Sequence, residues 1–183
     1  GGTVTVINVG DATTDATLRK ALAIGATDAV RIDANPANAS FVAAQIADYA
    51  SKNSFDLILT GRESIDYNGS QVAAMVGELL NIPSVSIVKS LEVADKNVTL
   101  EREIEGGKEI VSCPTPLVVS ATEGMAEPRI PNMRGIMSAR TKPLQAVAAV
   151  ATETHQQLVG YDKPAPRTQV KLIDASNVKA LVD

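Results

Sequence analysis

The chain has 183 residues, 45% of them apolar, and a formal net charge of −4 at pH 7, which allows one well-buried domain and argues against disorder. This charge, with two Phe, three Tyr and no Trp, argues against a nucleic-acid partner, because phosphate binding needs basic surface and single strands need stacking platforms. A single cysteine cannot form an internal disulfide, and no apolar run reaches the roughly 20 residues of a membrane helix. We therefore expect a protein without membrane insertion, from the bacterial cytoplasm or the mitochondrial matrix.

The first 80 residues alternate between strand and helix signals. Apolar runs predict strands at 3–9, 29–32 and 55–60, and apolar positions at helical spacing predict helices at 15–24, at 38–50 and from about residue 70 to the segment before Pro83. Gly25 is a stop signal for the first helix. Strands and helices that alternate in this way predict βαβ units and a doubly wound, mostly parallel sheet with right-handed crossovers.

The pattern changes after Pro83. Strands are predicted at 85–88, 97–104 and 110–112, with a hairpin turn at 105–108, as an antiparallel appendage. The apolar run at 117–120 is expected to return to the main sheet. From about Ala146 to Asp183 frequent proline and polar residues predict an extended tail, so we divide the chain into an α/β domain at 1–145 and a tail at 146–183. A tail of this length is unusual in a compact monomer, so we expect it to lie on another subunit.

Ligands of open α/β sheets bind at the carboxyl ends of the strands, which places the loops after Val9, Ile32 and Thr60 at the candidate site. The third loop ends where a helix begins. Its last residues would offer free backbone N–H groups and the positive end of the helix dipole to a phosphate, and a glycine there would let the phosphate approach closely. The alternative is that Asn68 or Ser70 merely caps the helix. On residue types alone both remain open.

The chain lacks the residues of common catalytic sites. His155 is the only histidine, which excludes a histidine acid–base pair and a multi-histidine metal centre within this chain. Cys113, next to Pro114, is expected to be a buried and inert thiol. The phosphate loop of nucleotide hydrolases, the dinucleotide fingerprint and the nucleophile elbow are absent. We therefore predict no catalytic residue and no metal site.

Four segments carry a resemblance to a known family. They are TLRKALAIGATDAV at 17–30, GRESIDYNGSQVAAMVGELLNIP at 61–83, VTLEREIEGGKEIV at 98–111 and EPRIPNMRGIMSARTKPL at 127–144. Together they resemble the beta subunits of electron transfer flavoproteins, in register over essentially the whole chain. Members of this family normally begin with one further strand and helix that this chain lacks. The start at Gly1-Gly2 without an initiator Met agrees with an origin inside a longer protein.

The resemblance implies an electron-carrier subunit that is not itself an enzyme, with a fold of the adenine nucleotide alpha-hydrolase type. It implies a heterodimer in which the alpha subunit holds most of the FAD and the beta subunit binds AMP, or a second FAD in bifurcating versions. Its electrons would come from dehydrogenases such as acyl-CoA dehydrogenases. Carried over by position, the nucleotide site would consist of Val9, Gly61, Ile65, Asp66, Ser70, Gln71 and Val72. Tyr67 stands where bifurcating members have a glycine and would crowd a second isoalloxazine, so AMP is favoured.

The resemblance also implies a recognition loop from about Glu127 to Arg140. In the family an apolar residue before Gly-Ile-Met inserts into a groove on the dehydrogenase, and here that residue is Met133. Ile130 and Arg134 are the other docking candidates, while Ile136 and Met137 are expected to anchor the loop to its own domain. The alternative is that Met133 packs inward, since exposed Met is uncommon.

Two other classes of protein compete with this interpretation. A free-standing adenine-nucleotide module similar to universal stress proteins would share the βαβ plan, but the hairpin and the long tail count against it. An enzyme of the nucleotide alpha-hydrolase-like group is disfavoured because the motifs are missing.

Overall fold

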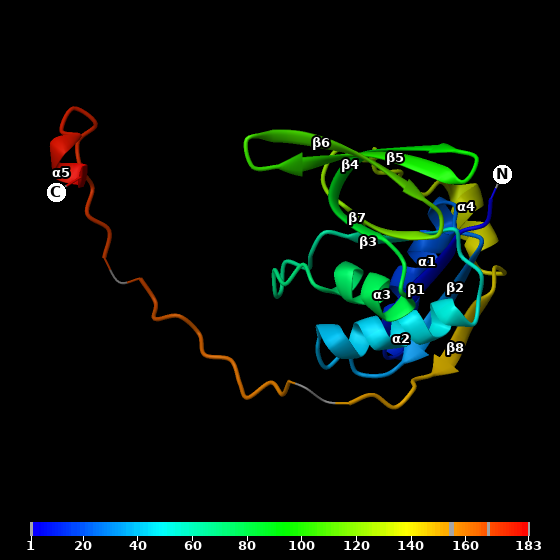
Figure 1. The fold of residues 1–183 in the computed structure, drawn as a ribbon. Coiled ribbons are helices and arrows are strands. Elements are labelled where there is room, and N and C mark those ends of the chain that lie inside the picture. Colours follow the sequence, from blue (N-terminus) through cyan, green and yellow to red (C-terminus); the bar gives the residue numbers. More distant parts are fainter. Residues whose placement is uncertain (1, 154–155, 168, 183) are drawn as a thin grey trace.

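A computed structural model describes residues 2–153, 156–167 and 169–182. It shows a mixed α/β body followed by an extended tail (Figure 1). In chain order the elements are β1 (Thr5–Gly10), η1 (Ala12–Thr14), α1 (Asp15–Ile24), β2 (Asp28–Asp33), α2 (Ala39–Ser51), β3 (Leu57–Gly61), α3 (Val72–Leu80), β4 (Ser84–Ala94), β5 (Asn97–Ile104), β6 (Gly107–Pro114), β7 (Leu117–Ala121), α4 (Met133–Ala139), β8 (Leu144–Ala148) and α5 (Lys179–Val182).

The ends of the helices follow from local chemistry. The side-chain oxygen of Asn38 accepts a hydrogen bond from the Phe41 amide at the start of α2, as N-cap residues do. Gly25 ends α1 with a φ of 137°, a conformation that residues with a side chain rarely adopt. Asn81 ends α3 in the left-handed conformation. The predicted helix at 15–24 and its glycine stop are confirmed.

The strands divide between two hydrogen-bonded sheets, where the sequence predicts one. The first sheet has three strands in the order β1-β2-β8, and the second has five in the order β3-β7-β4-β5-β6. Every pair in the first sheet is parallel, and β3, β7 and β4 are parallel to one another. The parallel strands with helical connections agree with the predicted βαβ units. Within the described residues, β1 and β3 are both edge strands, so no ladder joins the two parallel sections.

Strand β8 crosses the boundary predicted between residues 145 and 146. Residues 144–148 pair in parallel with β2, with Val147 opposite Ile32. The extended tail therefore begins after Ala148. The sequence did not indicate this strand because it is only five residues long and three of them, Gln145, Ala146 and Ala148, have weak strand propensity.

The antiparallel appendage is confirmed and is larger than predicted. β4 runs over 11 residues and pairs with β5, which pairs with β6. The turn predicted at 105–108 is shorter in the structure and covers 105–106, because β6 already begins at Gly107. β7 returns to the parallel section between β3 and β4, with Val118 opposite Ile58 and Ser84. Buried Val98, Leu100 and Leu117 form the core of this sheet.

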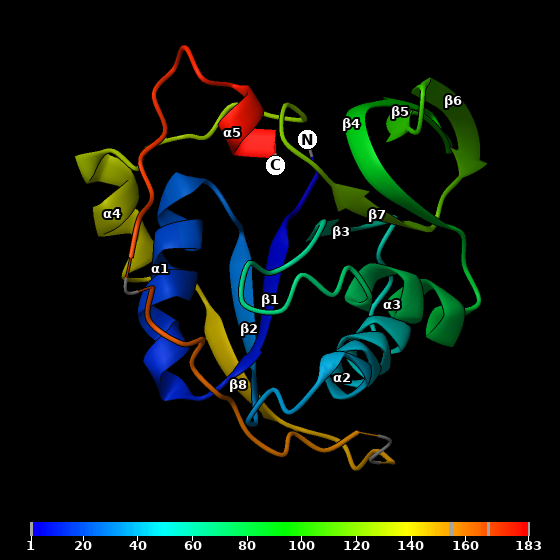
Figure 2. The same cartoon turned by 90° about the vertical axis from the view of Figure 1, so that its left-hand side faces the viewer.

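Helices lie on both sides of the three-stranded sheet (Figure 2). α1 and α4 pack together on one side, where Leu18, Leu22 and Ala139 are buried. α2 lies on the other side and packs against α3, with Ala43 and Val76 fully buried against β7. The loop from β3 to α3 and the start of the tail are thus held by rigid elements.

The tail leaves the body after β8 and ends in the short helix α5 (Figure 1). The buried side chain of Gln45 on α2 makes two hydrogen bonds to the backbone of Val150, one to its carbonyl (2.9 Å) and one from its amide (2.8 Å). Further along, the Tyr161 hydroxyl donates to the Tyr67 hydroxyl (2.9 Å), which raises the pKa of Tyr161. His155 lies outside the described residues.

Candidate functional site

The loop from β3 to α3 is open to solvent over its whole length. Ile65 is 89% exposed, Tyr67 is 70% exposed, and Asp66 is exposed as well. The Asn68 and Tyr67 amides both donate to the Ser64 carbonyl, at 2.8 and 3.2 Å, and Ser64 Oγ donates to the Asp66 carboxylate. The loop is therefore folded by its own hydrogen bonds, while its outer surface remains exposed to solvent and can contact a ligand.

The first turn of α3 has no side-chain cap. Gln71 occupies the N-cap position and makes no capping hydrogen bond. Ser70 Oγ donates instead to the Glu63 carboxylate (2.9 Å), and Asn68 lies further back in the loop. The alternative in which Asn68 or Ser70 caps the helix is therefore wrong, and the N–H groups of the first turn keep their capacity for an anion.

The backbone before α3 is accessible. A Cβ atom built on Gly69 would meet only the Gln71 side chain, at 3.9 Å or more. Gln71 itself is exposed and Val72 is half-buried. The nearby Glu63 carboxylate opposes an anion, but it pairs with Arg62 (3.5 Å), which offsets part of its charge. Close to the Gly69 backbone, the Gln71 side chain is thus the one neighbour among the described residues that an approaching group would meet.

The seven nucleotide-site candidates come from the two sheets and the segments attached to them. Gly61 to Val72 share one loop, whereas Val9 lies on β1 in the other sheet and is 7% exposed. Because the Val9 side chain is buried, Val9 can offer a nucleotide its backbone more readily than its side chain.

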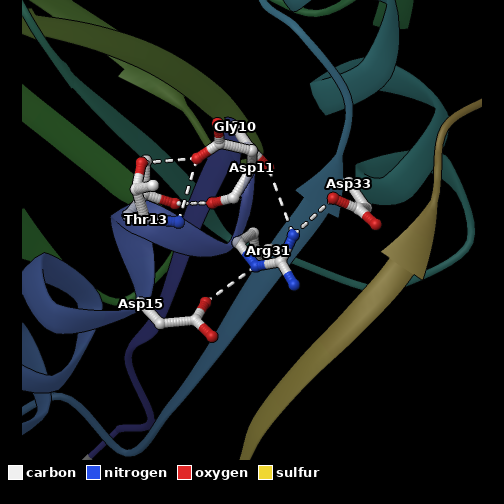
Figure 3. A network of polar contacts seen from close by, with 7 residues as sticks. Gly10, Asp11, Thr13, Asp15, Arg31 and Asp33 are labelled. Carbon is white, nitrogen blue, oxygen red and sulfur yellow. Dashed lines mark hydrogen bonds and ion pairs between the residues drawn. The ribbon is translucent and has the colours of Figure 1, made fainter.

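A polar network at the carboxyl ends of β1 and β2 was not indicated by the sequence (Figure 3). Arg31 is 7% exposed, and its guanidinium donates to Asp33 (2.6 Å), to Asp15 (2.7 Å) and to the Gly10 carbonyl (3.3 Å). The hydrogen bond to Asp33, followed by that to Asp15, raises the pKa of Arg31. The network fixes the ends of both strands to the start of α1. The available signal was an arginine within the apolar strand 29–32.

Asp11 closes the loop between β1 and α1. Its carboxylate accepts hydrogen bonds from the Thr13 hydroxyl and the Thr13 amide (2.9 Å), which hold the pKa of Asp11 below its ordinary value. A Cβ at Gly10 would lie 2.7 Å from Asn8 Oδ1 and 2.9 Å from the Thr14 side chain. Only glycine fits this turn without a shift of its neighbours.

The docking candidates lie on and before α4. Ile130 is 92% exposed, Met133 is 73% exposed, and Arg134 is also exposed. The alternative in which Met133 packs inward is therefore wrong. Met133 is the first residue of α4, and the preceding N-cap residue Asn132 accepts a hydrogen bond from the Gly135 amide through its side-chain oxygen (2.8 Å).

The expected anchors of this segment are wrong. Ile136 and Met137 are exposed, Met137 to 65%. The residues that face α1 are Gly135, whose backbone abuts the Ala23 carbonyl, and Ala139, which is 3% exposed. Sequence reasoning favoured the large apolar residues as anchors, but close helix packing selects small ones.

Three further features of the described residues concern the cysteine, metal binding and membrane insertion. Cys113 is half-buried and packs beside the core of the five-stranded sheet. No group of three or more His, Cys, Asp and Glu residues in the described part is arranged to hold a metal ion. Among the helices described, none is long and apolar enough to cross a membrane.

Residues 1–152 match the family model described as the electron transfer flavoprotein domain. The chain belongs to the electron transfer flavoprotein family. It is similar to the electron transfer flavoprotein subunit beta of Bacillus subtilis, with 38% identity over 149 residues, which is 79% of this chain and 58% of the relative. It is also similar to the subunit beta of Syntrophomonas wolfei, with 32% identity over 165 residues, 89% of this chain and 66% of the relative. The subunit beta of Thermoanaerobacterium thermosaccharolyticum is 33% identical over 145 residues, 78% of this chain and 56% of the relative. The chain thus spans less than two thirds of the length of these relatives.

Proposed function

We propose that the chain is the beta subunit of a heterodimeric electron transfer flavoprotein that accepts electrons from flavin dehydrogenases such as acyl-CoA dehydrogenases. The observation that carries the proposal is the family match over residues 1–152, together with relatives named subunit beta. In this role the chain holds a nucleotide, docks partners and supplies no acid, base or nucleophile. The bacterial relatives support the bacterial cytoplasm over the mitochondrial matrix as its location.

The proposed nucleotide is AMP, bound through its phosphate at the start of α3. Support comes from the uncapped first turn at Gln71 and from the open backbone at Gly69. The Tyr67 side chain extends into solvent from the same loop and would crowd a second isoalloxazine beside it. A second FAD, as in bifurcating versions, is therefore the less favoured ligand.

The proposed alpha subunit holds the FAD and receives the tail of this chain. Large apolar side chains of the tail are exposed, and they are Leu158, Val159, Tyr161, Val170 and Leu172. Apolar side chains strung along an extended segment gain little from folding alone and gain burial on a partner surface. The tail is therefore proposed as an arm that wraps the alpha subunit.

The nucleotide pocket is proposed to be completed by a further strand and helix of the full polypeptide. The chain spans 56% to 66% of its relatives, and the two parallel sections end in unpaired edges at β1 and β3 in the described part. Unpaired backbone N–H and C=O groups of edge strands are ready to pair with another strand.

The test is co-expression of the full polypeptide with its alpha-type subunit. We expect a complex with one FAD, and AMP released on denaturation and identified by mass spectrometry. Two flavins per complex would assign the bifurcating version. A colourless, stable homodimer with bound ATP would overturn the proposal in favour of a module of the universal-stress-protein type.

A further inference from the structure

Helix α4 contacts α1 so closely that only glycine fits at the contact. A Cβ atom at Gly135 would lie 2.3 Å from the carbonyl oxygen of Ala23 and 3.4 Å from its carbonyl carbon. These are backbone atoms within α1, so no side-chain rotation can relieve the overlap. One turn later Ala139 is buried against the same helix. Residue 135 therefore sets how near α4 lies to α1.

Two cationic side chains, those of Arg19 and Lys142, form hydrogen bonds between α1 and the α4 segment. Arg19 Nη1 on α1 donates to the Ala139 carbonyl and to the Lys142 carbonyl, both at 2.7 Å. Lys142 Nζ, beyond α4, donates to the Leu22 carbonyl (3.0 Å) and the Ala26 carbonyl (2.6 Å) at the end of α1. Carbonyls at helix ends lack partners within the helix, and a cation there also offsets the negative end of the dipole. Each helix end is thus satisfied from the other segment.

This attachment decides which face of α4 is presented to solvent. Successive residues of an α-helix are separated by about 100° around its axis, which places Gly135 about 200° from Met133. Met137 is four residues from Met133 and shares its face. Both methionines are exposed, at 73% and 65%. With Gly135 held against α1, the methionine face points outward.

We propose that Gly135, Arg19 and Lys142 are positioning residues for docking of the dehydrogenase, because they hold the methionine face of α4 in one orientation. This inference rests on the proposed function, since it assumes that α4 is the docking element. Interfaces gain affinity when the binding surface is held in its bound arrangement beforehand. A flexible Met side chain adapts to its partner, but only if the helix that carries it has a fixed place.

The test uses the complete FAD-loaded complex with a flavin dehydrogenase as electron donor. Gly135→Ala forces α4 away from α1, and we expect the KM for this complex to rise by about tenfold or more. kcat at saturation, flavin content and reoxidation by ferricenium, a small reagent that needs no docking surface, are expected to stay unchanged. Gly107→Ala is the matched control, because a Cβ there meets nothing within 4 Å. Its KM should equal that of the unmodified protein.

Lys142 supplies a second variant that introduces no overlap. Lys142→Met removes the donor and should raise KM in the same way, whereas Lys142→Arg keeps a cation and should retain most of the wild-type KM. If the Gly135→Ala subunit does not assemble into the complex, the comparison of Lys142→Met with Lys142→Arg tests the positioning role by itself. A KM that rises with Met133→Ala but stays unchanged with Gly135→Ala and Lys142→Met overturns the positioning role and leaves docking at α4 intact. If KM is unchanged in Met133→Ala, Gly135→Ala and Lys142→Met alike, docking at α4 itself is overturned.

Discussion

The amide of Gln45 offers a direct test of how the tail is attached. Gln45 is 1% exposed and makes two hydrogen bonds to the Val150 backbone, so it ties the first residues of the tail to α2. Gln45→Met keeps the length and volume of the side chain and removes both bonds. The change therefore isolates the polar contact from the packing.

The expected cost follows from these two bonds. Each contributes about 1 kcal/mol net, and a buried group left without a partner costs about 1–3 kcal/mol. Val150 is half-buried, so water can satisfy part of what is lost, and we expect unfolding to become easier by about 2–3 kcal/mol. For a chain of this size that corresponds to a fall in Tm of about 4–12 °C.

Thermal unfolding and hydrogen exchange at the Val150 amide are the measurements. We expect the exchange rate of this amide to rise by about tenfold or more in Gln45→Met. Gln145→Met is the matched control, because Gln145 is exposed on β8, and surface changes shift stability by about 0.5 kcal/mol or less. An unchanged exchange rate at Val150, with Tm equal to that of the control, would show that this contact does not hold the tail.

Three further predictions concern docking, the nucleotide and pH. Met133→Ala should leave the heterodimer and its FAD content intact and lower kcat/KM with acyl-CoA dehydrogenase by about tenfold; an unchanged rate removes Met133 from docking. Ser70→Asp places a second carboxylate at the start of α3, beside that of Glu63, which should repel a phosphate, so AMP content measured by mass spectrometry should fall. Full AMP content in this variant would rule out phosphate binding there. Because the pKa of Asp11 is lowered by Thr13 in the folded state, its stabilising contribution is present above the unfolded pKa and is lost as pH falls through the folded pKa. Below about pH 4 wild type should therefore lose more stability than Thr13→Ala in acid titrations followed by circular dichroism, and parallel titration curves would contradict this.

Elements whose signal is contained in a few neighbouring residues could be predicted. The helix at 15–24 ends at Gly25 as expected, and the turn at 105–106 joins β5 to β6. In each case the apolar period and the stop or turn residue lie within the same short window. The loop 61–72 could be singled out for the same reason, because its glycines and polar residues directly precede a helix.

Contacts between distant parts of the chain could not be predicted. Gln45 and Val150 are 105 residues apart, and neither residue type indicates the other. The pairing of β8 with β2 and the bonds from Arg31 to Asp15 and Asp33 likewise depend on where the strands lie. In the sequence Gly135 is one glycine within a predicted loop, and nothing near it in the chain indicates that the Ala23 carbonyl lies beside it.

The residues alone were enough to indicate the family resemblance, the alternation of strands and helices up to β7, and the loop at which a nucleotide is proposed to bind. They could do so because periodicity, caps and turns act over a few residues. Three features can be read only from the folded chain: the parallel strands form two sheets, α3 starts without a cap, and α4 turns Met133 and Met137 to solvent. These features are set by which segments pack together, and side chains far apart in the chain decide that jointly.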